Sequence, residues 1–207
     1  MSSHHVVREN QEPALIISSQ TDFDTETIGQ LLEWSPFTLV IGENIALMQV
    51  MGIKVDALML DAEINADTIC QFGVEIIKLE NTANNLLEKA LDYFIEKGFP
   101  AVNIVGHLLS EQTMTSMSSK IGQIKTVLFD ADYKLFFLEN RYEKWLPAGS
   151  ELQLIPQGRV FSLSIQNGKE TTEKDFLEEK INIITTKDGF FTITYKKGIL
   201  FVNEKWS

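Results

Sequence analysis

The protein has 207 residues, of which 44% are hydrophobic and 23% charged, and this composition excludes a disordered or fibrous chain. Its 29 acidic and 18 basic residues give a formal net charge of -11, which argues against binding to nucleic acid or to an anionic membrane. The single cysteine, Cys70, excludes an internal disulfide and a cysteine-bound metal cluster.

The first 143 residues alternate short apolar runs with helical patterns. The clearest helix covers 84–97, where Leu87, Leu91 and Phe94 fall on one side and Gly98 ends the helix. Strands separated by helices of this length predict an α/β domain with a mainly parallel, layered sheet. The other expected helices cover 25–34, 45–51 and about 110–120. The expected strands cover 14–17, 37–41, 56–60, 74–77, 101–105, 125–129 and 135–138.

The remaining residues contain strand patterns only. Turn residues separate these strands, among them Gly158, Gly168 and the pair Asp188-Gly189, which is typical of a tight hairpin. The acidic segment 177–180 is expected to be a surface loop. The pattern predicts a small antiparallel all-β sandwich. Its expected strands cover 151–155, 160–165, 181–186, 190–195 and 199–203.

Charge changes along the chain at the same place as the structural pattern. Residues 1–143 hold 9 basic and 21 acidic residues, whereas 144–207 hold 9 basic and 8 acidic residues. Pro147 and Gly149 supply turn chemistry near this point. We therefore predict two domains, an α/β domain over 1–143 and a β-sandwich over 144–207.

Few residues carry a recognisable chemistry by their spacing alone. Asp61 and Glu63 follow the strand expected at 56–60, and the carboxyl end of a parallel strand is a common ligand site. Two carboxylates at this spacing could hold a hard cation such as Mg²⁺, or they could form a solvated loop. His107 follows a strand that ends at Gly106, and it is either a ligand residue or a surface-loop histidine.

Four segments match the motifs of one enzyme family in chain order. Residues 52–64 read GIKVDALMLDAEI where the family has G-x-x-P-D-x-x-x-G-D-x-D-S. Residues 81–91 read NTANNLLEKAL where it has D-Q-x-x-T-D-x-x-K-A-L, and residues 106–114 read GHLLSEQTM where it has G-x-x-G-x-R-x-D-H. Residues 39–46 cover its Asp-Gly-Ala-Ala segment. With the matching order of elements, the chain resembles the thiamine pyrophosphokinase family.

The resemblance implies a function and a set of site residues. Members of this family transfer a diphosphate group from Mg²⁺-bound ATP to thiamine and release AMP. Asp61 and Glu63 would then bind Mg²⁺ and serve catalysis, and Glu43, Gly106 and Asn182 would contribute to binding ATP and thiamine. The resemblance also implies a homodimer, with thiamine held at the subunit interface.

The motifs also differ from the family at several positions. Leu86 stands where the family has Asp, Leu109 where it has Gly, and Glu111 where it has Arg. A leucine cannot bind a cation, and a glutamate repels phosphate. Two alternatives therefore stand beside the enzyme. One is a non-catalytic pseudoenzyme that binds thiamine or a related heterocycle, and the other is a structural or partner-binding protein on the same fold.

Three tryptophans, Trp34, Trp145 and Trp206, are candidates for stacking on a cationic thiazolium ring, or they are core or interface residues. Cys70 lies among apolar residues and is expected in the core. No run of about 18 apolar residues is present and Met1 to Glu12 hold no apolar stretch, so neither a membrane span nor a signal peptide is expected. These features favour a reducing, cytoplasmic location.

Overall fold

The computed structural model describes residues 12–18, 25–42, 48, 51–61, 74–79, 86–130 and 132–205. The chain divides into two compact units, Met1–Ala131 and Asp132–Ser207. This boundary lies before the expected one at 143, because strands β7 (Tyr133–Phe137) and β8 (Arg141–Leu146) pair within the second unit. Each helix in the described part of the chain is too short or too polar to be a membrane span.

The first unit contains a sheet whose strands follow the order β4-β3-β2-β1-β5-β6. Every pairing between these neighbours is parallel, in agreement with the sequence prediction for these strands. The strands are β1 Ala14–Ile17, β2 Thr38–Ile41, β3 Ala57–Asp61, β4 Glu75–Leu79, β5 Ala101–Val105 and β6 Lys125–Asp130. The helices are α1 Thr25–Leu32, α3 Leu86–Glu96 and α4 Glu111–Ser118. The helix expected at 45–51 lies mostly outside the described residues.

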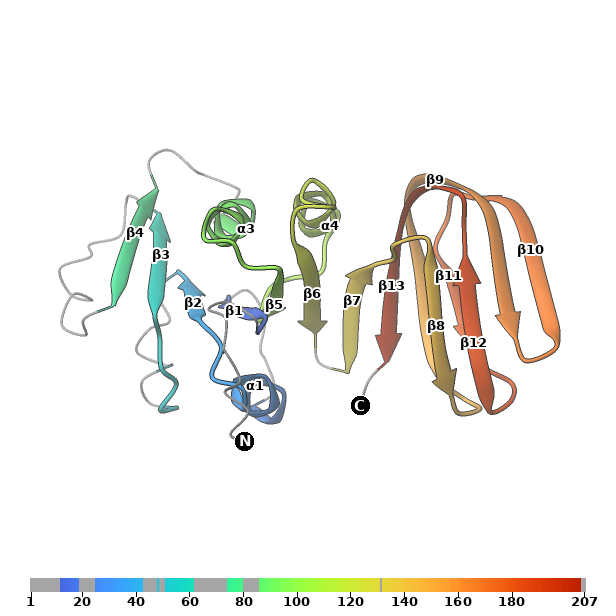
Figure 1. The fold of residues 1–207 in the computed structure, drawn as a ribbon, viewed down its shortest axis with the longest axis horizontal. Coiled ribbons are helices and arrows are strands. Elements are labelled where there is room, and N and C mark those ends of the chain that lie inside the picture. Colours follow the sequence, from blue (N-terminus) through green and yellow to red (C-terminus); the bar gives the residue numbers. More distant parts are fainter. Residues whose placement is uncertain are drawn as a thin grey trace, which may run out of the picture. The chain divides into compact units, whose positions relative to one another are not determined.

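Helices lie on both sides of this sheet, with α3 and α4 on one side and α1 on the other (Figure 1). Leu15 and Ile17 of β1 pack in one cluster with Ile28 of α1, and Ile16 between them is also fully buried. Because successive side chains of a strand point to opposite faces, both faces of β1 are covered. This explains why β1 and β2 read as continuous apolar runs rather than as alternating patterns.

The second unit is built on one long strand, β9 (Glu151–Asn167), which belongs to two sheets. The first half of β9 pairs with β11 (Ile181–Ile184) and β13 (Lys197–Lys205). Its second half pairs with β10 (Glu170–Leu177) and β12 (Gly189–Thr194). β7 extends the first sheet beyond β13, and β8 extends the second beyond β12. The two sheets are therefore β7-β13-β9-β11 and β10-β9-β12-β8, and all their pairings are antiparallel.

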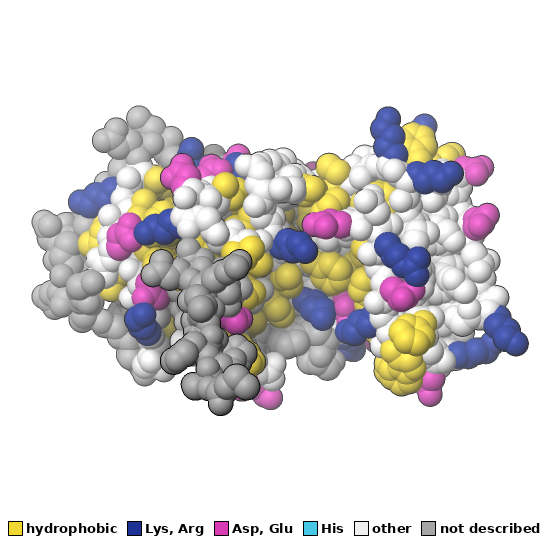
Figure 2. All heavy atoms as spheres, in the orientation of Figure 1, with side chains coloured by type: hydrophobic (Ala, Val, Ile, Leu, Met, Phe, Trp, Pro, Cys, Tyr) yellow, Lys and Arg dark blue, Asp and Glu magenta, His cyan; other side chains and the backbone are white. Residues whose placement is uncertain are grey.

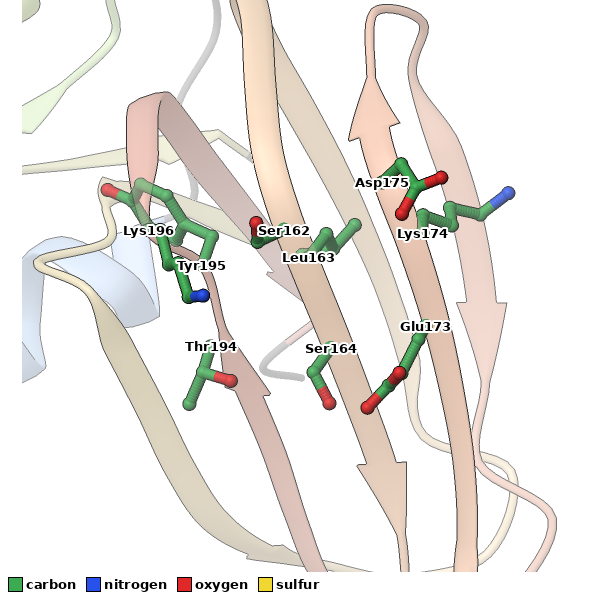
Figure 3. Close-up of a pocket in the computed structure, with 9 residues that line it drawn as sticks. All are labelled: Ser162, Leu163, Ser164, Glu173, Lys174, Asp175, Thr194, Tyr195 and Lys196. Carbon is green, nitrogen blue, oxygen red and sulfur yellow. The ribbon is translucent and has the colours of Figure 1, made fainter.

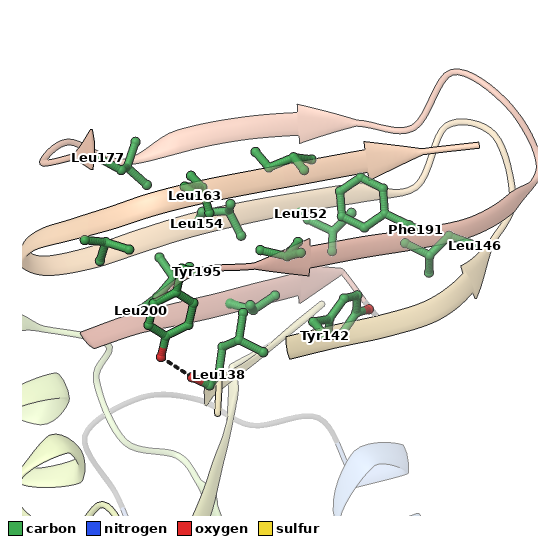
Figure 4. Packing of buried hydrophobic residues seen from close by; sticks show 14 residues of the cluster. Leu138, Tyr142, Leu146, Leu152, Leu154, Leu163, Leu177, Phe191, Tyr195 and Leu200 are labelled. Atoms are coloured by element: carbon green, nitrogen blue, oxygen red, sulfur yellow. Dashed lines mark hydrogen bonds between the residues drawn. The ribbon is translucent and has the colours of Figure 1, made fainter. Parts of the chain in front are cut away.

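The core of this unit lies between the two sheets (Figure 4). Leu152 and Leu154 come from the first half of β9, whereas Leu163 comes from the second half, and all belong to one cluster with Phe191 of β12. The Tyr195 hydroxyl donates a hydrogen bond to the Leu138 carbonyl at the edge of the cluster. Apolar side chains from both sheets thus share one core, which confirms the predicted β-sandwich arrangement.

Three strand predictions in this unit are wrong. The turn expected at Gly158 does not reverse the chain, because Gly158 (φ 74°) and Ser162 (φ 54°) bend β9 without ending it. The strand β10 was not predicted because its side chains are exposed except for Leu177. A strand without an apolar face has no alternating pattern to detect. The strand β8 occupies the segment assigned to the domain boundary.

Candidate functional site

The carboxyl ends of the parallel strands define one edge of the first unit's sheet. Ser18 follows β1, Gly42 follows β2 and Gly106 follows β5, while Asp61 ends β3. β1 lies between β2 and β5 and pairs with both. The chain continues from β1 through β2, β3 and β4 on one side of the sheet, and from β5 to β6 on the other side. Open α/β sheets bind ligands where the strand order reverses in this way. The edge between β1 and β5 is therefore the candidate site.

Two glycines shape this edge. Gly42 (φ 89°) and Gly106 (φ 68°) both adopt the left-handed conformation that side chains disfavour. The backbone N–H of Gly42 donates to the Met59 carbonyl at 3.0 Å. Both residues let the chain turn sharply where a strand ends, and neither places a side chain over the edge. Gly106, a residue singled out from the sequence, thus lies at the point where the strand order reverses.

The carboxylates implied by the resemblance fall at or beyond the limits of the described residues. Asp61 is the last residue of β3, and its backbone pairs with that of Leu79 in β4. The Asp61 side chain, Glu63 and Glu43 lie outside the described residues, as does Cys70. Carboxylates that follow neighbouring strands are the oxygen donors that Mg²⁺ prefers, so the donor set fits this ion by type. Within the described residues, no group of three His, Cys, Asp or Glu side chains could hold a metal.

His107 is a buried residue of this edge, and the interpretation as a surface-loop histidine is wrong. Only 7% of His107 is exposed, and its Nδ1 lies 3.1 Å from the Oγ of buried Ser18. This contact joins the end of β5 to the end of β1. Burial lowers the pKa of His107 to about 4, so the imidazole is neutral at pH 7.

Stability is expected to fall as the pH is lowered from about 6.5 towards 4. The unfolded state binds a proton at His107 in this window and the folded state does not, so acid favours unfolding by up to about 1.4 kcal/mol per pH unit. The variant His107→Asn keeps a polar atom near the Nδ1 position but cannot titrate. Urea unfolding across this window measures the free energy of unfolding of the unaltered protein and of His107→Asn. The stability advantage of the unaltered protein over the variant should shrink as the pH falls. Parallel curves for the two proteins would contradict the assignment.

The loop that leads from Gly106 into α4 is held by its own side chains. The Oγ of Ser110 accepts a hydrogen bond from the Thr113 backbone N–H at 3.1 Å and caps the helix. The Thr113 hydroxyl donates to the Leu108 carbonyl at 2.6 Å. Glu111 is exposed in the first turn of α4. A carboxylate therefore occupies the turn where the motif of the resembled family carries an arginine.

The second unit carries a pocket of about 520 Å³ on the outer face of the sheet β10-β9-β12-β8. Thr194, Ser164 and Glu173 form a row across β12, β9 and β10, and Lys174 points away from that row (Figure 3). The row follows from the register, since both Thr194 and Glu173 pair with Ser164. The lining is mixed, because Leu163 and Tyr195 contribute to it together with polar side chains. Sequence reasoning missed this pocket because β10 was not predicted.

The residues expected to bind thiamine belong to separate parts of the chain. Asn182 is exposed on β11, in the other sheet of the sandwich, and does not line this pocket. Trp34 is 71% exposed and Trp145 is 54% exposed, so neither is a core residue of this chain. Trp206 lies outside the described residues. Trp145 belongs to the second unit and Trp34 to the first.

Comparison with known proteins identifies the fold. No protein-family model and no curated protein matches the sequence. A thiamin pyrophosphokinase from Geobacillus thermodenitrificans has a TM-score of 0.74 and 11% identity, over 94% of this chain and 98% of that one. A thiamine pyrophosphokinase from Bacillus subtilis has a TM-score of 0.72 and 13% identity, over 93% and 98%. A thiamin pyrophosphokinase family protein from Enterococcus faecalis has a TM-score of 0.63 and 9% identity, over 94% and 99%. The chain therefore has the fold of these proteins along nearly its whole length.

Proposed function

We propose that the protein transfers a diphosphate group from ATP to thiamine and releases AMP. The observation that carries the proposal is that Asp61, at the end of β3, lies on the same carboxyl-end edge of the sheet as Gly106, which follows β5 at the point where the strand order reverses. The fold shared with thiamin pyrophosphokinases supports it. The location that we propose is the cytoplasm.

In the proposed reaction the thiamine hydroxyl oxygen attacks the β-phosphorus of ATP. The bond between this phosphorus and the oxygen that bridges to the α-phosphate breaks, AMP leaves with that oxygen, and the hydroxyl proton passes to solvent. Bound Mg²⁺ supplies charge neutralisation for the triphosphate. Asp61 and Glu63 would hold this ion, with Glu43 beside them. The chain's own task is then to orient the two substrates, because phosphoryl transfer depends mainly on positioning.

Other residues would bind the substrates. The turn at Gly106 leaves its backbone free of a side chain, so phosphate oxygens can come close. The neutral imidazole of His107 would hold the ends of β1 and β5 together beneath the nucleotide. Asn182 would contact thiamine through its amide group. We also propose that the active form is a homodimer, in which a second copy completes the thiamine site.

The test is an assay for both products. The purified protein at high concentration is incubated with ATP, Mg²⁺ and thiamine, and AMP and thiamine diphosphate are separated by chromatography. The proposal expects the two products in equal amounts, and neither when thiamine is omitted. If a folded sample forms neither product, the transfer reaction is contradicted. Calorimetric titration with thiamine then distinguishes a protein that binds thiamine without transfer from a protein that does not bind it.

Replacing Glu111 by arginine is expected to tighten ATP binding by about three- to tenfold, because repulsion of the triphosphate becomes attraction. Glu96→Arg is the matched control. It makes the same charge change at the end of α3, which precedes β5 and so lies towards the opposite edge of the sheet. Calorimetric titration of each variant with ATP measures the effect. An equal gain in both variants would mean that only net charge matters and that Glu111 does not face the nucleotide.

A further inference from the structure

Two large aromatic side chains lie side by side on the outer face of the sheet β10-β9-β12-β8. Trp145 of β8 and Phe190 of β12 are register partners on antiparallel strands, and register partners point to the same face. Trp145 is 54% exposed and Phe190 is 63% exposed. A chain gains free energy by burying such rings, so an exposed pair of this size is a candidate for contact with a ligand.

A pocket of about 420 Å³ lies next to this pair. It is lined by Phe190 together with Glu143, Thr192 and Gln166, which form a row across β8, β12 and β9. The Thr192 hydroxyl donates to the Glu143 carboxylate at 3.4 Å, and the Gln166 side-chain amide donates to the Gly168 carbonyl at 3.0 Å. These bonds orient the carboxylate and the amide before any ligand arrives. The Gln166 carbonyl oxygen and the second Glu143 oxygen remain as acceptors.

The polar surface continues beyond this row. The row of Thr194, Ser164 and Glu173 lies two residues further along β12 and β9, at a spacing of about 7 Å, and continues onto β10. We name the whole surface the sandwich face. It comprises Trp145 and Phe190, the row Glu143, Thr192 and Gln166, and the row Thr194, Ser164 and Glu173.

Charges on the sandwich face are balanced. Arg141 forms an ion pair with Glu143, and Lys196 lines the same pocket as Glu173. Figure 2 shows one face of the molecule, on which charged side chains of both signs are scattered among uncharged and hydrophobic ones. A phosphate-bearing ligand would need an excess of positive charge. A stable interface with another protein would need an apolar centre, whereas hydroxyl, amide and carboxylate groups make up most of this face.

We propose that the sandwich face binds a neutral oligosaccharide. A sugar ring has one side rich in C–H groups, which packs on an aromatic ring, and a rim of hydroxyls that both donate and accept hydrogen bonds. Trp145 and Phe190 supply the rings, and the acceptors Glu143 and Gln166 lie directly beside them. The second row, with its larger pocket, extends the surface for a chain of several sugars. The proposal is independent of the diphosphate transfer, because none of the residues of the sandwich face has a role in the proposed transfer.

The test is calorimetric titration of the full chain with maltohexaose, cellohexaose, xylohexaose and chitohexaose. At least one of these sugars is expected to bind. Trp145→Ala and Phe190→Ala should each weaken that binding by about tenfold or more without lowering the melting temperature, because both side chains are exposed. Trp34→Ala is the matched control, since it removes an exposed tryptophan from the other unit and should leave the affinity unchanged.

Three results would overturn the proposal. The first is the absence of binding to every one of these hexasaccharides at about 5 mM, where even weak sites become occupied. The second is a smaller mass of Trp145→Ala in sedimentation than of the unaltered protein, which would show that a second copy of the chain covers this face. A loss of affinity in Trp34→Ala equal to that in Trp145→Ala would assign the binding to another surface and also count against it.

Discussion

Asp61→Asn is expected to abolish formation of AMP and thiamine diphosphate, with kcat/KM falling by about a thousandfold or more. Asparagine has nearly the same size and keeps one oxygen, but it lacks the negative charge that would hold Mg²⁺ against the triphosphate. Asp61 is the last residue of β3, so the backbone pairing of the strand should survive the change. The product assay described above measures the loss.

Asp175→Asn is the control for this prediction. It removes the same charge from an exposed position on β10, in the other unit, and turnover should not change. Thermal unfolding of both variants should match that of the unaltered protein. Full turnover in Asp61→Asn would exclude this carboxylate from the reaction. A loss in Asp175→Asn as large as that in Asp61→Asn would show that the effect is not local to the sheet edge.

Glu204→Ala is expected to lower the free energy of unfolding of the second unit by about 3 kcal/mol. Glu204 is only 4% exposed, at the end of β13. Its carboxylate accepts a hydrogen bond from the Tyr142 hydroxyl at 3.0 Å and pairs with the ammonium groups of Lys144 and Lys134. Burial and the nearby Glu204 charge raise the pKa of Tyr142, so the phenol stays protonated as a donor. The carboxylate therefore joins β13 to β8, which belongs to the opposite sheet.

Two comparisons isolate the role of burial. Glu204→Gln keeps an acceptor for Tyr142 but loses the charge, so it should destabilise less than Glu204→Ala. Glu151 also pairs with a lysine and a tyrosine, Lys205 and Tyr133, but its side chain is 45% exposed. Glu151→Ala should therefore cost about 1 kcal/mol or less. Urea unfolding measures all of them, and equal losses in Glu204→Ala and Glu151→Ala would refute the argument.

The sequence alone was enough to predict the parallel sheet of the first unit. Runs such as 14–17 and 101–105 are short and apolar, and helical patterns separate them, so the chain has to cross over between parallel strands. The hydrophobic pattern did not predict strands whose side chains are mostly exposed, because burial does not select apolar residues there. β10 has a single buried side chain, and its backbone pairs with β9 along most of its length. Gly158 predicts a turn, but in the structure the chain only bends there. Beyond the bend, β9 continues and pairs with a strand of the second sheet, β12.

Some features of the candidate site also follow from the sequence, and others depend on the tertiary structure. The positions of Asp61 and Gly106 at strand ends follow from the sequence, because a strand that ends in a polar residue or a glycine brings it to the sheet edge. The burial of His107 against Ser18 does not, since it depends on β1 and β5 becoming neighbours across 89 positions of sequence.

The exposed pair of Trp145 and Phe190 likewise arises only when β8 and β12 align. Local periodicity reports which way a side chain faces within its own strand, and it therefore determined the parallel strands and the crossovers of the first unit. Which residues meet at the sheet edge and on the sandwich face was decided by pairing between distant strands, because that pairing depends on a core to which the whole unit contributes.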